Sequence, residues 1–331
     1  MNVRLIEAAV VVGTALFSLV LVVAVRRLTI RLHLFDRPND RSSHTVPTPR
    51  CGGAGIVVAV IAGTAVLVRV TSAPSHSLVK LLAAAVLIAA VSLIDDLRTL
   101  SAAVRFPVHL IASAIVVMTI GYWQDAAAGH LLVHFGIAGA LLTCLWIAGV
   151  TNVYNFMDGI DGIAGVQALT AGTAWAIIGL NAGALPAAIM GAVIAAASLG
   201  FLFHNWPPAR IFMGDVGSAF LGFLFAATPL LVPLRDSLAR AILVLWPFLF
   251  DSTFTLLRRL RRRENIFAAH RSHLYQRLII SGRSHRFVTT LYGLLAVWGA
   301  LAAITMSRWV LLPLALMPPA LWLFVVRQER A

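Results

Sequence analysis

The chain has 331 residues, of which 60% are hydrophobic and 12% are charged. Soluble domains carry about 45–50% apolar and about 25% charged residues, so the composition excludes an ordinary soluble enzyme, a disordered chain and a disulfide scaffold. The net charge of +13 does not indicate nucleic-acid binding, because no soluble domain is present to carry a basic surface and because membrane proteins concentrate Lys and Arg in their cytoplasmic loops.

Long apolar blocks recur along the chain, and about 20 apolar residues are enough to cross a bilayer once. We read eleven candidate spans, at 7–25, 54–71, 78–94, 106–123, 131–150, 163–180, 183–203, 216–233, 238–257, 287–306 and 309–326. The division of 163–203 into two spans rests on the short segment from Asn181 to Pro186. The pattern predicts an all-α polytopic membrane protein with about 10–11 transmembrane helices in a single integral-membrane domain over residues 1–331.

The loops between these spans differ strongly in charge. One set, at 26–53, 95–105, 151–162, 204–215, 258–286 and the C-terminal tail, holds 20 of the 26 Lys and Arg residues. The positive-inside rule assigns this set to the cytoplasm, which places the N-terminus outside. Ten of the 13 Asp and Glu residues lie in or beside the same set. Because a carboxylate near hydrocarbon usually has a function or a partner, we predict one active-site cleft on the cytoplasmic face.

The first cytoplasmic loop reads FDRPNDRSSHTVPTPRCGG over residues 35–53. Its prolines and paired glycines indicate a structured loop that is rich in turns. Arg37, Arg41, His44 and Arg50 are candidates to meet an anionic head group. An ordinary cytoplasmic loop is the alternative until the other motifs are considered.

The third predicted span ends in SLIDDL, with adjacent Asp95 and Asp96. Neighbouring carboxylates repel one another, and a divalent cation or a cationic side chain relieves that repulsion. Oxygen ligands of this kind suit Mg²⁺ or Mn²⁺. An isolated pair of aspartates carries little information, so this motif gains its meaning from the others.

The string NVYNFMDGIDGIAG, residues 152–165, follows the fifth predicted span. Asn152, Asn155, Asp158 and Asp161 recur every three residues, which keeps them on one face of a tight helical turn. The glycines between them allow backbone or ligand to approach closely. The string resembles a calcium loop only superficially, because the glutamate twelve positions on is missing.

The string HNWPPARIFMGDVGSAFLG, residues 204–222, leads into the eighth predicted span. Asp215 lies between two glycines where that span begins. A helix N-terminus offers free N–H groups to phosphate, and its dipole stabilises Asp215 as an anion. Phe212 offers a flat face to a base, although a single Phe at a span entrance more often simply packs.

The segment RRLRRRENIFAAHRSHLYQRL, residues 258–278, contains two basic groups. The five arginines within 258–263 are most simply an anchor that meets anionic lipid head groups. His270, Arg271 and His273 have a spacing that presents two imidazoles and a guanidinium to one phosphate. Zinc binding by the two histidines is the alternative, and the absence of thiolates and the cationic flank disfavour it.

Taken in order, DRPNDRSSHTVPTPRCGG, IDDL, NVYNFMDGIDG, FMGDVGS and HRSHLYQ resemble the polyprenyl-phosphate N-acetylhexosamine-1-phosphate transferase superfamily. The resemblance implies transfer of a sugar 1-phosphate from a UDP-sugar to undecaprenyl phosphate, with release of UMP, in the inner membrane of a bacterium. The HRSH form is similar to the branch that starts O-antigen and related cell-envelope glycans. UDP-GlcNAc is the default donor, and other UDP-N-acetylhexosamines fit the same motifs. A homodimer is compatible with the resemblance.

The resemblance also implies a role for each matching residue. Mg²⁺, or Mn²⁺ in its place, is expected on Asp215 with Asp95 beside it. Asp161 is expected to contact uracil, and Phe212 to stack on it. The expected catalytic residues are Asp95, Asp96, Asp158, His270, Arg271 and His273. The expected substrate-binding residues are Asn152, Asn155, Asp161, Asn205, Phe212, Arg105, Arg50 and His44.

An ion-coupled membrane transporter is the alternative from another class, since intramembrane acids are its usual mark. A transporter would carry its acids near the centres of spans and at discontinuous helices. In this sequence the acids gather at one face beside long basic loops, which favours the transferase. A catalytically inactive scaffold is a third reading, disfavoured because no motif is visibly incomplete.

Overall fold

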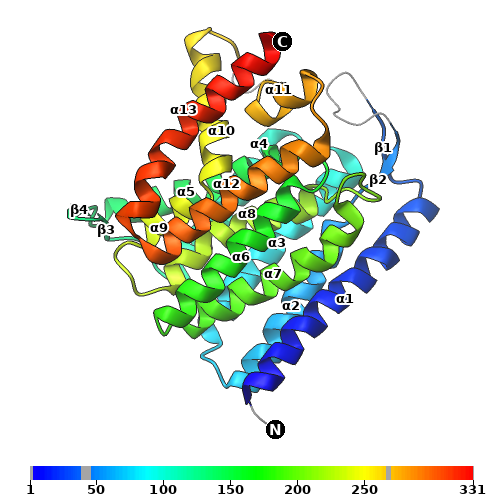
Figure 1. Ribbon diagram of the computed structural model, residues 1–331. Helices are drawn as coiled ribbons and strands as arrows, with labels where there is room; N and C mark the ends of the chain where they lie inside the picture. The colour runs from blue at the N-terminus through cyan, green and yellow to red at the C-terminus, as the bar shows by residue number, and fades with distance from the viewer. Residues whose placement is uncertain (1–2, 39–45, 266–269, 331) are drawn as a thin grey trace.

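The computed structural model describes residues 3–38, 46–265 and 270–330 (Figure 1). The helices of its first part are α1 Val3–Arg31, α2 Gly53–Thr71, α3 His76–Arg98, α4 Ala102–Thr119, α5 Ala138–Phe156, α6 Ile163–Asn181 and α7 Leu185–Asn205. Those of its second part are α8 Asp215–Ala227, the 3₁₀ helix η1 Thr228–Leu231, α9 Ser237–Val244, α10 Trp246–Arg261, α11 Leu274–Ile280, α12 His285–Thr305 and α13 Arg308–Arg330. The strands form two antiparallel hairpins, β1 Phe35–Asp36 with β2 Thr48–Pro49 and β3 Asp125–Ala128 with β4 Leu131–His134.

Among the described residues, nine helices are long and apolar enough to cross a membrane, namely α1 to α7, α12 and α13. The pair α9 and α10 counts as a tenth span if its two members, bent by 78° at Leu245, are taken together. Pro247 explains the break, because proline has no N–H to continue the hydrogen-bonded ladder of a helix. The all-α polytopic membrane fold predicted from the sequence is thereby confirmed.

Of two predicted boundaries, the structure confirms one and corrects the other. The short segment from Asn181 to Pro186 does separate two helices, α6 and α7. The span predicted at 131–150 is wrong in its first part, because residues 131–134 form the exposed strand β4 and α5 begins only at Ala138. Gly129, with φ of +60°, lies in the turn between β3 and β4. The apolar run therefore contains a turn that hydropathy alone does not reveal.

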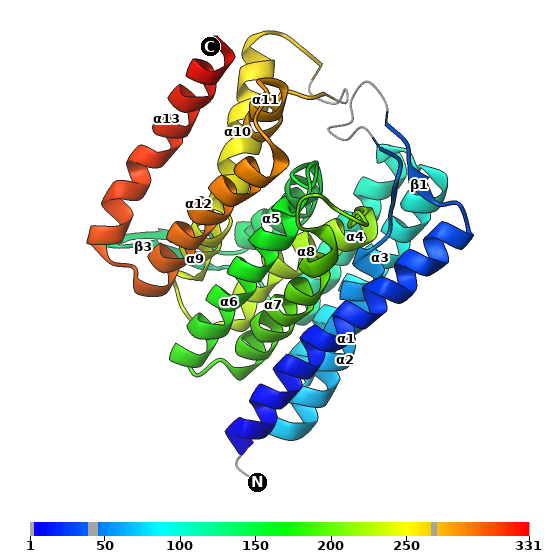
Figure 2. The ribbon, with the colours of Figure 1, turned by 45° about the vertical axis from the view of Figure 1, so that its right-hand side comes forward.

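The long helices alternate in direction, so each end of the bundle collects every second connection (Figures 1 and 2). The N-terminus lies at one end, while the β1–β2 hairpin, α11 and the C-terminus lie toward the other. Helix α7 is central, since 78% of its most apolar stretch is buried against 17% for α1 and for α13. Helices α1 and α13 therefore form flanks that face the lipid.

Small residues allow the central helices to pack closely, as is usual in membranes. A Cβ added to Gly172 on α6 would lie 2.7 Å from the Ala195 nitrogen on α7, and one added to Gly191 on α7 would lie 2.3 Å from the Ala176 nitrogen on α6. The crossing of α2 and α8 is equally tight, because a Cβ on Gly53 would lie 2.2 Å from the Gly217 Cα. This second crossing brings the first loop against the segment before Asp215.

Replacing Gly53 by Ala is expected to destabilise the protein, because the added methyl group meets backbone that has no room to move. Overpacking of this kind costs roughly 1–3 kcal/mol, seen as a lower midpoint of thermal unfolding in detergent. Gly13→Ala on α1 is the matched control, since no heavy atom lies within 4 Å of its added Cβ. Equal midpoints for the two variants would contradict the close crossing of α2 and α8.

Candidate active site

The predicted site residues are carried to one end of the bundle by different helices. The C-terminal ends of α3, α5 and α7 and the N-terminal ends of α4 and α8 supply most of them. Asp95 and Asp96 end α3, Asp158 and Asp161 follow α5, and Asp215 begins α8. The sequence motifs, up to 120 residues apart, are joined there by hydrogen bonds between their side chains and backbone.

Asp96 binds the first turn of α8. Its Oδ1 accepts the N–H of Asp215 at 3.0 Å and its Oδ2 accepts the N–H of Val216 at 3.0 Å. Gly214 has φ of +74°, and a Cβ added there would lie 2.7 Å from Asp96 Oδ2. The Asp96 carboxylate therefore binds two of the free N–H groups at this helix N-terminus. These groups were predicted from the sequence to be available to phosphate.

Asp95 and Asp215 share one guanidinium. Arg105 Nη1 donates to Asp95 Oδ2 at 2.6 Å and to Asp215 Oδ2 at 2.9 Å, and the two carboxyl groups are close enough to interact directly. The second oxygen of Asp95 accepts the N–H of Leu100 at 2.5 Å. The side chains of Arg105 and Asp215 are 29% and 31% exposed, so this charged cluster can be reached from the end of the bundle.

The two asparagines of α5 connect neighbouring helices. Asn155 Oδ1 accepts the Ser218 hydroxyl on α8 at 2.8 Å. Asn152 Nδ2 lies 3.2 Å from His109 Nδ1 on α4 and donates to the Ala148 carbonyl at 2.8 Å. Asn155 therefore links α5 to α8, which carries Asp215, and Asn152 links α5 to α4, which carries Arg105.

Asp158 is half-buried beside three other carboxylates. Burial raises the pKa of its carboxyl group well above the usual range, and the charges of Asp215, Asp96 and Asp161 raise this pKa further, in that order. Among the described residues no side chain forms an ion pair with Asp158. Asp158 therefore lies within electrostatic reach of three other carboxyl groups.

Asp161 and Asn205 fasten the loop between α5 and α6. Asp161 accepts the N–H of Ala209 at 3.0 Å and lies 3.2 Å from His285 Nδ1 on α12. The buried amide of Asn205 accepts the N–H of Gly162 at 2.9 Å and donates to the Ile211 carbonyl at 2.9 Å. Both residues hold the loop in place here, and their contacts with nucleotide stay a prediction.

The first loop pairs with the segment before Asp215. Phe212 N–H donates to the Pro49 carbonyl at 2.8 Å, and the Phe212 carbonyl accepts Gly52 N–H at 2.9 Å. Arg50 is half-buried within electrostatic reach of Asp96. Burial, followed by the charge of Asp96, raises the pKa of the Cys51 thiol to about 12. His44 and Arg41 lie outside the described residues.

His273 is held by a buried carboxylate. Its Nδ1 lies 3.2 Å from Asp251 Oδ1, and only 3% of the residue is exposed. Asp251 is fully buried and also accepts the N–H groups of Leu274 and Tyr275, at 2.8 and 3.1 Å, and the Tyr292 hydroxyl at 2.5 Å. One carboxylate of α10 therefore fixes the start of α11 and the histidine before it.

His270 and Arg271 precede this anchored turn. The His270 ring lies 5.0 Å from that of His273, and its Nδ1 lies 2.9 Å from the Ser272 hydroxyl. Burial, then the charges of His273 and Arg259, lower the pKa of His270 to about 4. Near neutral pH the His270 imidazole is therefore neutral. Half-buried Arg271 is the cation within the HRSH motif.

The family model for glycosyl transferase family 4 matches residues 78–232 of this chain. A protein of Bacillus subtilis, named a probable undecaprenyl-phosphate N-acetylglucosaminyl 1-phosphate transferase, is 32% identical over 92% of this chain and 86% of its own length. The chain belongs to this family of glycosyl transferases. It is accordingly an enzyme, a membrane-embedded phosphotransferase, and the resemblance seen in its motifs is confirmed.

More distant members of glycosyl transferase family 4 agree. The decaprenyl-phosphate N-acetylglucosaminephosphotransferase of Mycobacterium tuberculosis is 30% identical over 80% of this chain and 73% of its own length. The undecaprenyl-phosphate alpha-N-acetylglucosaminyl 1-phosphate transferase of Yersinia pestis is 25% identical over 95% of this chain and 89% of its own length. These relatives give the transporter alternative no support.

The charge balance of this family 4 site suits a small cation. Within the described ranges, no three His, Cys, Asp or Glu side chains stand close enough to hold a metal ion alone. Mg²⁺ usually takes only one or two protein carboxylates and fills its other positions with water and substrate phosphates. The adjacent carboxylates of Asp95 and Asp215, with Asp158 nearby, fit that requirement.

Two supports of the transferase site were missed in the sequence analysis. Asp251 was counted among the acids but given no role, although a lone acid in an apolar run is a functional candidate by default. The second is the pairing of α11 with α13, in which Arg277 donates to both carboxylate oxygens of Glu329. No local pattern signals that pair, because its members are separated by 52 residues.

Tyr275 links the HRSH motif to the loop of Asp158. Its hydroxyl donates to the Phe156 carbonyl at 3.1 Å. A Cβ added to Gly159 would lie 2.1 Å from the hydroxyl oxygen of Tyr275. Gly159→Ala is therefore expected to push the loop away and to lower transfer by about tenfold or more, since a misplacement of 1 Å can cost about 10²-fold.

A second substitution, at Tyr275, tests whether steric crowding causes the loss of rate in Gly159→Ala. Tyr275→Phe removes the oxygen that the new methyl group would meet, so Gly159→Ala combined with Tyr275→Phe is expected to recover part of the rate. The measurement is the initial rate of transfer by wild type, both single variants and the double variant. Strictly additive losses would show that Gly159 is not needed for the approach of Tyr275.

Proposed function

We propose that the enzyme transfers N-acetylhexosamine 1-phosphate, with N-acetylglucosamine as the first candidate, from a UDP-sugar to undecaprenyl phosphate and releases UMP. The observation that carries the proposal is the arrangement of Arg105 between Asp95 and Asp215, in a chain whose relatives are named as polyprenyl-phosphate N-acetylglucosamine 1-phosphate transferases. The proposed place of the reaction is the cytoplasmic face of a bacterial inner membrane, at the first membrane step of O-antigen or another cell-envelope glycan.

The chemistry requires two anions to meet, a lipid phosphate and a sugar diphosphate. A lipid phosphate oxygen forms a bond to the β-phosphorus, and the bond from the β-phosphorus to the bridging oxygen breaks, so UMP leaves with that oxygen. A phosphate monoester has a second pKa of about 6, so the nucleophile is largely ionised near neutral pH. No residue is therefore needed to remove a proton from it.

Different residues of the site are proposed to bind the lipid phosphate, the diphosphate and the nucleotide. Arg105 is placed by Asp95 and Asp215 and can turn its guanidinium to the incoming phosphate. Arg271 lies two residues before the anchored His273 and is proposed to bind the diphosphate, with neutral His270 as a hydrogen-bonding partner. The proposed nucleotide site is the loop of Asp158 and Asp161, bordered by Phe212.

Mg²⁺, or Mn²⁺ in its place, is the proposed cofactor, held by Asp215 with Asp95 and Asp158 near it. When bound, the ion supplies positive charge that offsets the repulsion between the two phosphates. Asp96 is not proposed as a ligand of the ion, because both of its oxygens accept N–H groups of α8. We therefore assign Asp96 the positioning of Asp215.

The test of this function is UMP release by purified protein in detergent, with undecaprenyl phosphate, Mg²⁺ and a panel of UDP-GlcNAc, UDP-GalNAc and UDP-glucose. We expect release that depends on both lipid and metal, with an N-acetylated donor preferred. Release with UDP-glucose alone would contradict the proposed donor class. Absence of release with every donor, together with absence of UMP binding, would contradict the function as a whole.

Asp95→Asn is expected to lower the transfer rate by about 10²-fold at every pH. Asp95 positions Arg105 and lies beside the proposed metal site. Neither role involves the transfer of a proton, so the loss of rate should not depend on pH. The measurement is the pH profile of initial rates for the variant and for wild type. Full rescue of the variant at high pH would instead assign Asp95 the role of a base.

A further inference from the structure

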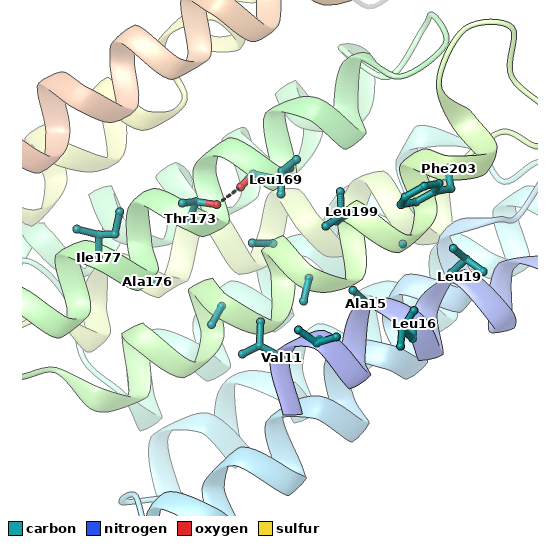
Figure 3. A pocket seen from close by; sticks show the side chains of 15 residues that line it. Val11, Ala15, Leu16, Leu19, Leu169, Thr173, Ala176, Ile177, Leu199 and Phe203 are labelled. Atoms are coloured by element: carbon teal, nitrogen blue, oxygen red, sulfur yellow. Dashed lines mark hydrogen bonds between the residues drawn. The ribbon is translucent and has the colours of Figure 1, made fainter. Parts of the chain in front are cut away.

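A long apolar groove lies between α1, α6 and α7, away from the active site. It encloses about 510 Å³, and among its lining residues Thr173 alone has a polar side chain. The Thr173 hydroxyl donates to the Leu169 carbonyl at 2.8 Å, so it offers no donor to an occupant (Figure 3). The labelled side chains of α1, α6 and α7 point into or border the same space.

The groove opens on the outer face of the bundle. Leu16 is 59% exposed, Leu199 is 41% exposed and Phe203 is 66% exposed. These residues belong to helices that are long and apolar enough to span the membrane, so hydrocarbon is the environment they meet. An alkyl chain is therefore the kind of ligand that fits the groove itself.

The groove ends in two arginines and a histidine, namely Arg26, Arg210 and His204, which we call the basic rim. Arg26 lies seven residues after Leu19, on the same face of α1, and its Nε donates to the Arg210 carbonyl at 3.0 Å. His204 follows Phe203, lies beside the Leu19 backbone and has both arginines as electrostatic neighbours. Its Nε2 is buried and makes no hydrogen bond within the described part of the chain.

The two arginines of the basic rim lack an acidic partner among the residues that the structure describes. In the described part of the chain, no carboxylate forms an ion pair with Arg26 or Arg210. A phosphate placed there would receive charge-assisted hydrogen bonds from the two guanidinium groups. The rim therefore complements a negative charge at the end of an alkyl groove.

We propose that the groove binds an anionic glycerophospholipid, with one acyl chain between α1 and α7 and its head-group phosphate on the basic rim. The site differs from that of the reacting phosphate, because Arg105 belongs to α4, which packs on α3 and α5. Arg210 lies next to Ala209, whose N–H donates to Asp161. A lipid on the rim thus stabilises the loop that supports the candidate nucleotide site.

The test compares lipids that differ only in head-group charge. The thermal midpoint of the purified protein is measured with phosphatidylglycerol or phosphatidylcholine of identical chains, and the lipid retained after purification is counted by native mass spectrometry. We expect a larger upward shift with phosphatidylglycerol and roughly thirtyfold tighter retention, the factor expected for two basic side chains at an anionic lipid.

Two variants, each with a matched control, locate the site. Arg26→Gln combined with Arg210→Gln is expected to remove the preference for phosphatidylglycerol, whereas Arg286→Gln combined with Arg327→Gln removes two exposed charges at the same end and should keep it. Leu199→Trp fills the groove and should lower retention of the lipid. Leu316→Trp, at a leucine on α13 that is 70% exposed, should leave retention unchanged.

Three outcomes would overturn the proposal. The first is equal shifts with the two phospholipids in wild type. The second is an unchanged preference in the double variant of Arg26 and Arg210. The third is a Leu199→Trp variant that retains phosphatidylglycerol normally but loses affinity for undecaprenyl phosphate, which would assign the groove to the lipid substrate.

Discussion

Replacing Asp215 by Asn is expected to lower sugar-phosphate transfer by at least about 10²–10³-fold, the loss typical of removing one electrostatic group from an active site. The variant removes the negative charge 2.9 Å from Arg105 Nη1 and the main proposed ligand of Mg²⁺. The protein is expected to fold and insert normally, because Asp96 binds backbone N–H groups of α8 and not the Asp215 side chain.

The control for this variant is Asp125→Asn, which removes one carboxylate from the β3–β4 hairpin at the opposite end of the bundle. Initial rates and thermal midpoints are measured on the same preparations. A rate within about threefold of wild type for Asp215→Asn would contradict its place at the centre of the site. A lowered midpoint with the rate loss would indicate a structural role instead.

Asp251→Ala is expected to have the largest effect on stability. It leaves the N–H groups of Leu274 and Tyr275, the Tyr292 hydroxyl and His273 Nδ1 without their buried acceptor. Breaking a buried charged network of this kind costs about 3–5 kcal/mol, or a fall in the thermal midpoint on the order of 10 °C. Transfer should fall as well, because the HRSH motif loses its anchor.

Ser252→Ala is the matched control for Asp251→Ala. Ser252 is the next residue of α10 and is equally buried, and its hydroxyl makes no hydrogen bond to any described residue. Its removal should leave both the midpoint and the rate close to wild type. If Asp251→Ala and Ser252→Ala behave alike, the acceptor role of Asp251 is wrong.

The sequence was sufficient to predict the helical membrane fold and the gathering of motifs at one end. Hydropathy gives the spans because each helix that faces lipid must be apolar over its whole length. The separation of α6 from α7 followed from the short segment from Asn181 to Pro186, in which Asn, Gly and Pro interrupt the apolar run. The concentration of Lys and Arg in alternate loops indicated which ends of the spans lie together. Most of the acidic residues lie in or beside the same loops.

The contacts that organise the site could not be predicted in this way. Asp96 and Val216 are 120 residues apart, and nothing local to either shows that the carboxylate caps α8. Asn205 was expected to meet substrate, while its amide bridges two loops of the protein. Such roles depend on which loops fold against each other, which is a property of the packed bundle.

The proposed transfer of a sugar 1-phosphate is tested most directly by following the β-phosphorus of UDP-GlcNAc. Purified protein is incubated with undecaprenyl phosphate, Mg²⁺ and donor labelled at that atom, and the products are separated into lipid and water-soluble fractions. Transfer of a sugar 1-phosphate predicts that the label enters the lipid and that unlabelled UMP is released. Label recovered as UDP, with a sugar on the lipid, would show transfer of the sugar alone and contradict the proposed reaction.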